Sequence, residues 1–378
     1  MCERSLKPLI LGATIIFFLI SIFLPIRLGA ARSSQTLTVP DDYPTIQAAI
    51  NASNPEATVF VRTGIYHEHV TLNKPLTLRG ETAQSTTIDG DKTDGNVVSI
   101  VASNVTLSNL TIRNSQVGFA GVRVDNVRNC TISGSYVVNN WYGILIHQCL
   151  DTNVTDNNVR NNADGIHIES FSGNDVVTEN AVIDQTFFGV HLISSSNITV
   201  ATNNVSNTAY GIYLDSSSNV QILQNNASYN GYGLFLDTSS SNEAIGNSVT
   251  GNDICGVYFY GYSSNNGFYN NGFAANKQQV NGTGGQENAW DNGIRGNYWS
   301  DYLAKYPNAT EVGNSGFYAI PYVVDADNTD HHPLISYTTV PEFSLPAFLF
   351  LIIPLFLVTI VFLAKKGMSL KNGNPLVT

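Results

Sequence analysis

Three histidines and one glutamate recur at similar intervals in the middle of the chain, and these residue types could carry acid–base chemistry. They are His147, His167, Glu169 and His191. An imidazole with an ordinary pKa of about 6.5 can give or take a proton near neutral pH, and an adjacent carboxylate can orient it. Imidazole nitrogens also bind transition metals, so a metal site is the alternative interpretation. Any catalysis is therefore expected at these four residues.

Aromatic and acidic side chains follow the same interval and favour saccharide binding. The apolar faces of sugar rings stack on aromatic side chains, while sugar hydroxyl groups hydrogen-bond to carboxylates. The expected contact residues are Asp125, Tyr213, Asp215, Phe235, Asp237, Tyr258 and Tyr260. Aromatic ladders also stabilise stacked strands when no ligand is present. A purely structural role is therefore the competing hypothesis.

Both sets of residues belong to a run of Gly-apolar-x-apolar tetrads. These tetrads are GVRV at 121–124, GILI at 143–146, GIHI at 165–168, GVHL at 189–192, GIYL at 211–214, GLFL at 233–236 and GVYF at 256–259. Successive glycines are 22 to 24 residues apart, which is typical of a solenoid. Within a strand, the first and third residues after glycine should face inward and the second and fourth outward. The outward residues include all the candidates named above.

Two further short strands are expected in each repeat. The second opens with an asparagine, at Asn129, Asn153, Asn197 and Asn219. The third is marked by Val159, Val182, Val205, Ala227, Val249 and Phe273. Three strands per repeat predict an all-β fold, a right-handed parallel β-helix with about 22 residues per turn and roughly eleven turns. The recurrent bend asparagines are expected to form an internal ladder of side-chain amides.

The predicted domain organisation places this β-helix, with an N-terminal helical cap at 43–51, over residues 36–280. An aromatic, aperiodic module at 281–338 should close the other end, because solenoids need caps. Residues 1–31 have the layout of a secretory signal peptide or an uncleaved signal anchor. The apolar stretch at 343–364 is long enough to span a bilayer, and the lysines after it place the tail at 365–378 in the cytoplasm. We expect a β-helix on the extracellular side, held by a C-terminal transmembrane helix.

Composition narrows the classes of partner. The net charge is −11 and only 12% of the residues are charged, so a nucleic-acid partner is not expected. The predicted partner is an extracellular polysaccharide or glycoprotein, besides the membrane itself. No resident cofactor is predicted from the residues, and the sequence gives no indication of the oligomeric state.

Three segments carry a resemblance to a known family: VPDDYPTIQAAIN…GIYHEHVTLNKPLTLRG, the repeat NNASYNGYGLFLDTSSSN, and GNYWSDY…IPYVVDADNTDHHPL. Over about residues 36–335 the chain resembles the NosD-like, carbohydrate-binding and sugar-hydrolysis group of right-handed β-helix proteins. This resemblance implies three alternatives to simple glycan binding: a polysaccharide lyase or glycoside hydrolase, a copper-related accessory protein, or a structural surface protein. It also implies copper, or calcium in an acidic loop of the closing module, where this chain reads KYPNATEVGNSGFYA. The segment VPEFSLPAFLF…FLAKKG resembles the sorting signals of archaeal surface proteins.

Overall fold

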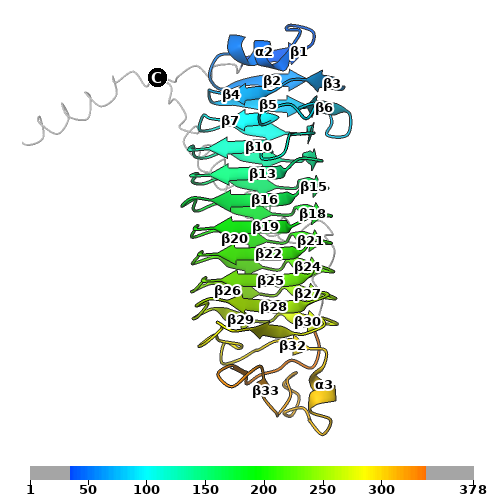
Figure 1. Ribbon diagram of the computed structural model, residues 1–378, viewed down its shortest axis with the longest axis vertical. Helices are drawn as coiled ribbons and strands as arrows, with labels where there is room; N and C mark the ends of the chain where they lie inside the picture. Colours follow the sequence, from blue (N-terminus) through cyan, green and yellow to red (C-terminus); the bar gives the residue numbers. More distant parts are fainter. Residues whose placement is uncertain (1–34, 338–378) are drawn as a thin grey trace, which may run out of the picture.

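Each repeat folds into three short strands separated by tight bends, and every strand pairs in parallel with the equivalent strand of the next repeat. The computed structural model describes residues 35–337, which form an elongated stack of turns, the parallel β-helix that the repeats predict (Figure 1). No helix within residues 35–337 is long and apolar enough to cross a bilayer. The predicted signal segment at 1–31, the sorting motif, the transmembrane helix at 343–364 and the tail at 365–378 lie outside the described residues.

The tetrads form one ten-stranded sheet, which we call the tetrad sheet. Its strands are β4 (Val70–Leu72), β7 (Val98–Ile100), β10 (Ala120–Asp125), β13 (Tyr142–His147), β16 (Asp164–Glu169), β19 (Phe188–Ile193), β22 (Tyr210–Asp215), β25 (Tyr232–Asp237), β28 (Cys255–Tyr260) and β31 (Val280–Gly282). Figure 1 shows these strands stacked along the long axis of the molecule.

Two eleven-stranded sheets complete the turns. The second sheet contains β1 (Thr36–Val39), β2 (Ala57–Val61), β5 (Leu76–Gly80), β8 (Thr106–Ser108), β11 (Thr131–Ser133), β14 (Asn153–Thr155), β17 (Val176–Thr178), β20 (Thr199–Ala201), β23 (Gln221–Leu223), β26 (Glu243–Ile245) and β29 (Gly267–Tyr269). The third contains β3 (Gly64–His67), β6 (Thr86–Asp89), β9 (Thr111–Arg113), β12 (Tyr136–Val138), β15 (Asn158–Arg160), β18 (Ala181–Ile183), β21 (Asn204–Ser206), β24 (Asn226–Ser228), β27 (Ser248–Thr250), β30 (Gly272–Ala274) and β32 (Tyr298–Trp299).

The interior is a continuous apolar column, because alternate residues of every strand point inward. In the tetrad sheet, Ile144 and Ile166 pair in register and are fully buried. The glycine that opens each tetrad lies where adjacent turns approach closely. A Cβ atom at Gly165 would lie 2.5 Å from the carbonyl oxygen of Gly189 and 2.5 Å from Cγ1 of Val182. Glycine is therefore required by close packing at this position.

Buried asparagines form hydrogen-bonded ladders at the bends between strands. The longest ladder lies between the second and third sheets and consists of Asn157, Asn180, Asn203, Asn225, Asn247, Asn271 and Asn297. Nδ2 of Asn180 donates to Oδ1 of Asn203 at 3.0 Å and also to the carbonyl oxygens of Thr178 and Val154, both at 2.9 Å. Each interior amide thus satisfies its own hydrogen bonds and those of the adjacent turns.

The predicted internal ladder is confirmed, but its assignment to the asparagines that open the second strand is wrong. Asn129, Asn153, Asn197 and Asn219 are exposed. Asn197 and Asn219 have left-handed backbone conformations with φ of 57° and 53°, so they make the outward corner of a bend. The next residues, Ile198 and Val220, point inward and are fully buried.

A short helix covers the N-terminal end of the column. Helix α2 (Ile46–Ala52) is capped by Thr45, whose hydroxyl accepts a hydrogen bond from the backbone N–H of Ala48 at 3.2 Å. Its buried face carries Ile46 and Ile50, which are fully buried in the core. The helix therefore shields the apolar interior where the first turn has no neighbour.

Aromatic residues close the C-terminal end. Trp290 stacks on Phe268 with ring centroids 4.6 Å apart, and Trp299 stacks on Phe273 at 4.7 Å. Beyond them lie helix α3 (Tyr302–Lys305) and the hairpin strands β33 (Tyr322–Val323) and β34 (Thr329–Asp330).

The carboxylate of Asp330 ends the longest asparagine ladder. It is fully buried and accepts hydrogen bonds from Asn297 N at 2.7 Å, Trp299 Nε1 at 2.9 Å and His332 N at 3.0 Å. The last asparagine of the ladder and the aromatic closure are therefore joined through one side chain.

Candidate functional site

The outer face of the tetrad sheet carries three columns of side chains in register. The leading column precedes each glycine and runs Ala120, Tyr142, Asp164, Phe188, Tyr210, Tyr232 and Cys255. The middle column runs Arg123, Leu145, His167, His191, Tyr213, Phe235 and Tyr258. The trailing column contains Asp125, His147, Glu169, Ile193, Asp215, Asp237 and Tyr260. All the residues predicted from the sequence therefore share one face.

The lower half of this face, from β19 to β28, is aromatic. The His191 ring lies parallel to Tyr213 at 4.8 Å, and Tyr210 lies parallel to Tyr232 at 5.2 Å. Phe235 stacks on Tyr258 at 4.9 Å. The stack consists of two adjacent columns that also contact each other, because each leading ring packs against a middle ring. This gives a broad aromatic surface rather than a single row of rings.

The upper half, from β10 to β16, is charged. Nδ1 of His147 lies 2.8 Å from Oδ1 of Asp125, and Arg123 lies 3.4 Å from the same carboxylate. His147 is therefore paired with Asp125 of the preceding turn. Within residues 35–337, no hydrogen bond joins His147 to His167. The charged half ends where His167 meets His191, with ring centroids 4.7 Å apart.

His167 lies between two carboxylates. Its Nδ1 is 3.1 Å from Oδ2 of Asp164, and its Nε2 is 3.5 Å from Oε2 of Glu169. Burial alone would lower the pKa of His167, but interaction of the imidazole with the two carboxylates, which accept its protons in hydrogen bonds, outweighs burial and raises that pKa. The hydrogen bond from His167 lowers the pKa of Glu169 in turn. The structure therefore brings His167 and Glu169 within 3.5 Å of each other, and their acid–base role stays a prediction.

His191 differs from His167 because it forms no hydrogen bond with a carboxylate of residues 35–337. It is 5% exposed and packs against the ring of Phe188 at 4.1 Å. Burial, helped by the charge of His167, lowers the pKa of His191 to about 3. This imidazole is therefore neutral near pH 7, which suits stacking or metal binding better than proton transfer.

Sequence reasoning missed the leading column, and with it Asp164. The signal was present, because an aromatic residue precedes the tetrad glycine at Tyr142, Phe188, Tyr210 and Tyr232. These leading rings cover the middle column, so His167 and His191 are buried although they point away from the core. The remaining predicted contact residues are half-buried, except Tyr260, which is 55% exposed.

Two clusters within residues 35–337 could hold a metal ion. Asp164, His167 and His191 are all buried, while His67, Asp89 and Asp91 at the N-terminal end are mostly exposed. In the second cluster, Asp89 is engaged by Arg113 at 2.7 Å, which competes with a cation for its carboxylate. The candidate ligands of the first cluster are therefore better shielded from water, and none of them is paired with an arginine within the described range.

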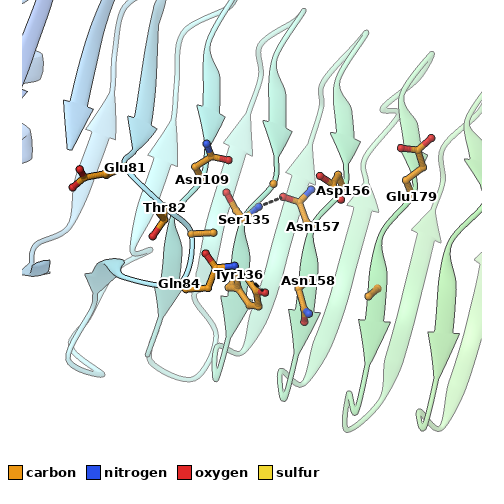
Figure 2. A pocket seen from close by; sticks show the side chains of 13 residues that line it. Glu81, Thr82, Gln84, Asn109, Ser135, Tyr136, Asp156, Asn157, Asn158 and Glu179 are labelled. Carbon is orange, nitrogen blue, oxygen red and sulfur yellow. Dashed lines mark hydrogen bonds between the residues drawn. The ribbon is translucent and has the colours of Figure 1, made fainter. Parts of the chain in front are cut away.

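A polar groove of about 520 Å³ lies away from the tetrad sheet, at the bends between the second and third sheets (Figure 2). It offers the carboxylates of Glu81, Asp156 and Glu179, together with the hydroxyl of Tyr136 and several amides. Figure 2 shows Asp156 and Glu179 in neighbouring turns, while Glu81 lies farther along the axis, beyond the turns of Ser135 and Asn109. The titratable groups that line the groove are these three carboxylates and the Tyr136 phenol.

Comparison with protein families identifies the chain. The family described as "Periplasmic copper-binding protein (NosD)" matches residues 50–205 and 103–304. The chain belongs to this family. Among curated proteins compared by sequence, none matches this NosD-family chain.

Solved structures of low sequence identity share the fold. The A-module of the mannuronan C-5 epimerase AlgE4 of Azotobacter vinelandii is 18% identical, covers 64% of this chain and 94% of its own, and has a TM-score of 0.43. ORF18 of Geobacillus virus E2 is 16% identical, with coverages of 74% and 65% and a TM-score of 0.50. A DFA-IIIase of Arthrobacter chlorophenolicus A6, in complex with GF2, is 12% identical, with coverages of 67% and 93% and a TM-score of 0.50. At these identities the likeness extends to the fold alone.

Proposed function

We propose that the protein binds a polysaccharide outside the cytoplasm, along the aromatic half of the tetrad sheet. The family description, which names the periplasm, supports a location beyond the cytoplasmic membrane. The observation that carries the proposal is the double column of half-buried rings on β19–β28, flanked by the carboxylates of Asp215 and Asp237 in the two central turns. The apolar face of a sugar ring gains contact area on such a surface.

The flanking carboxylates supply the polar contacts. Asp215 and Asp237 occupy neighbouring turns of the trailing column. One oxygen of each accepts a hydrogen bond from the next residue, Ser216 or Thr238, at 2.8 Å. Oδ2 of Asp237 also accepts a hydrogen bond from the hydroxyl of Tyr213 at 3.3 Å. The remaining lone pairs of the two carboxylates can accept hydrogen bonds from sugar hydroxyl groups at these two turns.

The same carboxylates predict the class of polysaccharide. The trailing column places Asp125, Glu169, Asp215 and Asp237 along one edge of the face, and the whole chain has a net charge of −11. A polyuronate would meet like charges along this edge, whereas a neutral or amino sugar polymer would not. We therefore propose a neutral or amino polysaccharide as the ligand.

The family description also names copper, and the described residues do not suit a sulfur-based copper(I) centre. Copper(I) favours thiolate and thioether ligands, but residues 35–337 contain no methionine. The three cysteines in that range are buried, and their sulfur atoms donate hydrogen bonds to backbone carbonyl oxygens. Burial raises the pKa of Cys149 to about 11, which keeps the thiol protonated.

Binding can be tested with alanine variants of the most accessible rings. In affinity electrophoresis on a panel of neutral, amino and uronate polysaccharides, we expect Tyr258→Ala and Tyr260→Ala to weaken retention about two- to tenfold per ring. Tyr229→Ala is the matched control, because Tyr229 is 65% exposed and lies outside the tetrad sheet.

Two outcomes would contradict this proposal. Equal retention of the wild type and of both ring variants, with native circular dichroism, would place the site elsewhere. A wild-type protein that retains no polysaccharide, combined with a lower melting temperature for Tyr258→Ala, would favour the purely structural role of the rings.

A further inference from the structure

The aromatic stack is interrupted at one turn, where Asp164 occupies the leading-column position that Tyr142 and Phe188 hold in the adjacent turns. A carboxylate replaces a ring at this point, directly beside two imidazoles. Asp164 and His167 are 6% exposed and His191 is 5% exposed, so all three groups are shielded from water.

The imidazole of His191 has no hydrogen-bond partner. Neither its Nδ1 nor its Nε2 is bonded to any described residue, and both atoms are buried. A buried polar atom without a hydrogen-bond partner destabilises the folded protein. By contrast, the buried asparagines of the ladders donate through their side-chain amides to oxygen atoms of neighbouring turns. The orphaned nitrogens of His191 therefore call for a ligand.

The geometry around these nitrogens suits a metal ion. One potential ligand atom from each of Asp164, His167 and His191 can be chosen so that all lie within 4.8 Å of one another. Oδ2 of Asp164 and Nδ1 of His167 are 3.1 Å apart, a separation compatible with two ligands each about 2.0–2.2 Å from a shared ion. Behind His167, the carboxylate of Glu169 lies 3.5 Å from Nε2 and can accept its proton in a hydrogen bond.

We propose that Asp164, His167 and His191 bind one divalent transition-metal ion of the zinc or copper(II) class. Two imidazoles and one carboxylate are the donor types that these ions accept. Three protein ligands leave a fourth position for water or for an oxygen atom of a bound molecule. The site lies at the upper end of the aromatic surface, where the middle column changes from rings to charged groups.

The test is to titrate metal-free full-length protein with Zn²⁺ and to measure binding by isothermal titration calorimetry. We expect the wild type to bind one equivalent of Zn²⁺. Neither His191→Phe nor Asp164→Asn should bind this ion. His191→Phe keeps an aromatic ring between Phe188 and Tyr213, so it should fold and should not be less stable than the metal-free wild type. Zn²⁺ should raise the melting temperature of the wild type but not of either variant.

His67→Gln is the control, because it removes the only histidine of the second acidic cluster. We expect His67→Gln to bind one equivalent of Zn²⁺, as the wild type does. Cu²⁺ bound to the wild type should show coupling to imidazole nitrogen in electron paramagnetic resonance. Retention of the equivalent by folded His191→Phe and Asp164→Asn, its loss in His67→Gln, or a copper spectrum without coordinated nitrogen would each overturn the proposal.

Discussion

At the scale of single residues, ionisable groups in the interior decide how the fold responds to pH. Asp175 is 1% exposed and lies in the bend before β17, in register with Ile198, Val220 and Asn242. Its Oδ1 accepts a hydrogen bond from Thr152 N at 2.7 Å, but its Oδ2 has no partner in the described residues. Burial raises the pKa of Asp175 to about 7.

The raised pKa predicts a loss of stability as the pH increases. The folded protein keeps a proton on Asp175 that the unfolded chain releases above about pH 4. The stabilising contribution is complete below that pH and is lost as the pH rises through about 7. Asp175→Asn keeps an acceptor for Thr152 without the charge. Relative to the wild type, we expect the free energy of unfolding of this variant to be about 1–3 kcal/mol higher at pH 8 and little changed at pH 4. Thermal unfolding across the pH range measures this difference. An equal effect at both pH values would contradict the assignment.

At the scale of elements, side-chain hydrogen bonds at the bends join successive turns, in addition to the backbone pairing of the strands. Asn203 accepts two hydrogen bonds from Asn180 and donates to Asn225, so its side chain joins three turns. Asn197 is an exposed corner of the preceding bend in the same turn. The two asparagines differ in what their side chains contact, although they lie only six residues apart.

Replacing Asn203 should therefore cost far more than replacing Asn197. Asn203→Ala leaves the backbone N–H of Asn180 without its acceptor and removes the hydrogen bonds that Asn203 makes with the side chain of Asn180 and with the carbonyl oxygen of Val177. An orphaned buried group costs about 1–3 kcal/mol. Asn197→Ala should cost less than about 1 kcal/mol, mainly from the left-handed backbone. The denaturant midpoints of the two variants test this difference. Similar midpoints would show that the ladder is not a main source of stability.

The tetrads predicted the strands and the shared outer face because close glycine packing and alternation fix both over many repeats. The four-residue motif begins at its glycine, so it could not include Asp164 or Phe188, which lie one position earlier. Burial of His191 also escaped prediction, because it depends on Phe188, which lies just before the tetrad, and on rings from the adjacent turns. The ladder asparagines were misplaced since Asn is frequent both at outward corners and inside bends, and composition does not separate these positions.

At the scale of the whole molecule, each turn contacts its neighbours and the two ends need separate closure. The C-terminal end depends on Asp330, which bonds the last ladder asparagine, the Trp299 indole and His332. Because each turn contacts only its neighbours along the axis, a destabilising substitution at this end should affect the nearby turns more than the distant ones.

Asp330→Ala tests that independence. The variant leaves three buried donors unpaired, so we expect faster hydrogen exchange in β29, β30 and β32 by a factor of ten or more, since about 1.4 kcal/mol already corresponds to tenfold. Exchange in β10, β13 and β16 should stay unchanged. Asp327→Ala, at an exposed position nearby, is the control. A uniform increase along the whole chain would indicate a single cooperative unit instead.

The in-register repeat of about 22 residues has an evolutionary consequence. Duplication of one repeat within a gene would add one strand to each sheet, one amide to a ladder and one row to the outer face in a single event. The surface would lengthen by about 4.8 Å for each duplication, without a new fold having to evolve. Homologous proteins that arose in this way could therefore differ in the length of ligand that they bind, while keeping the same interior.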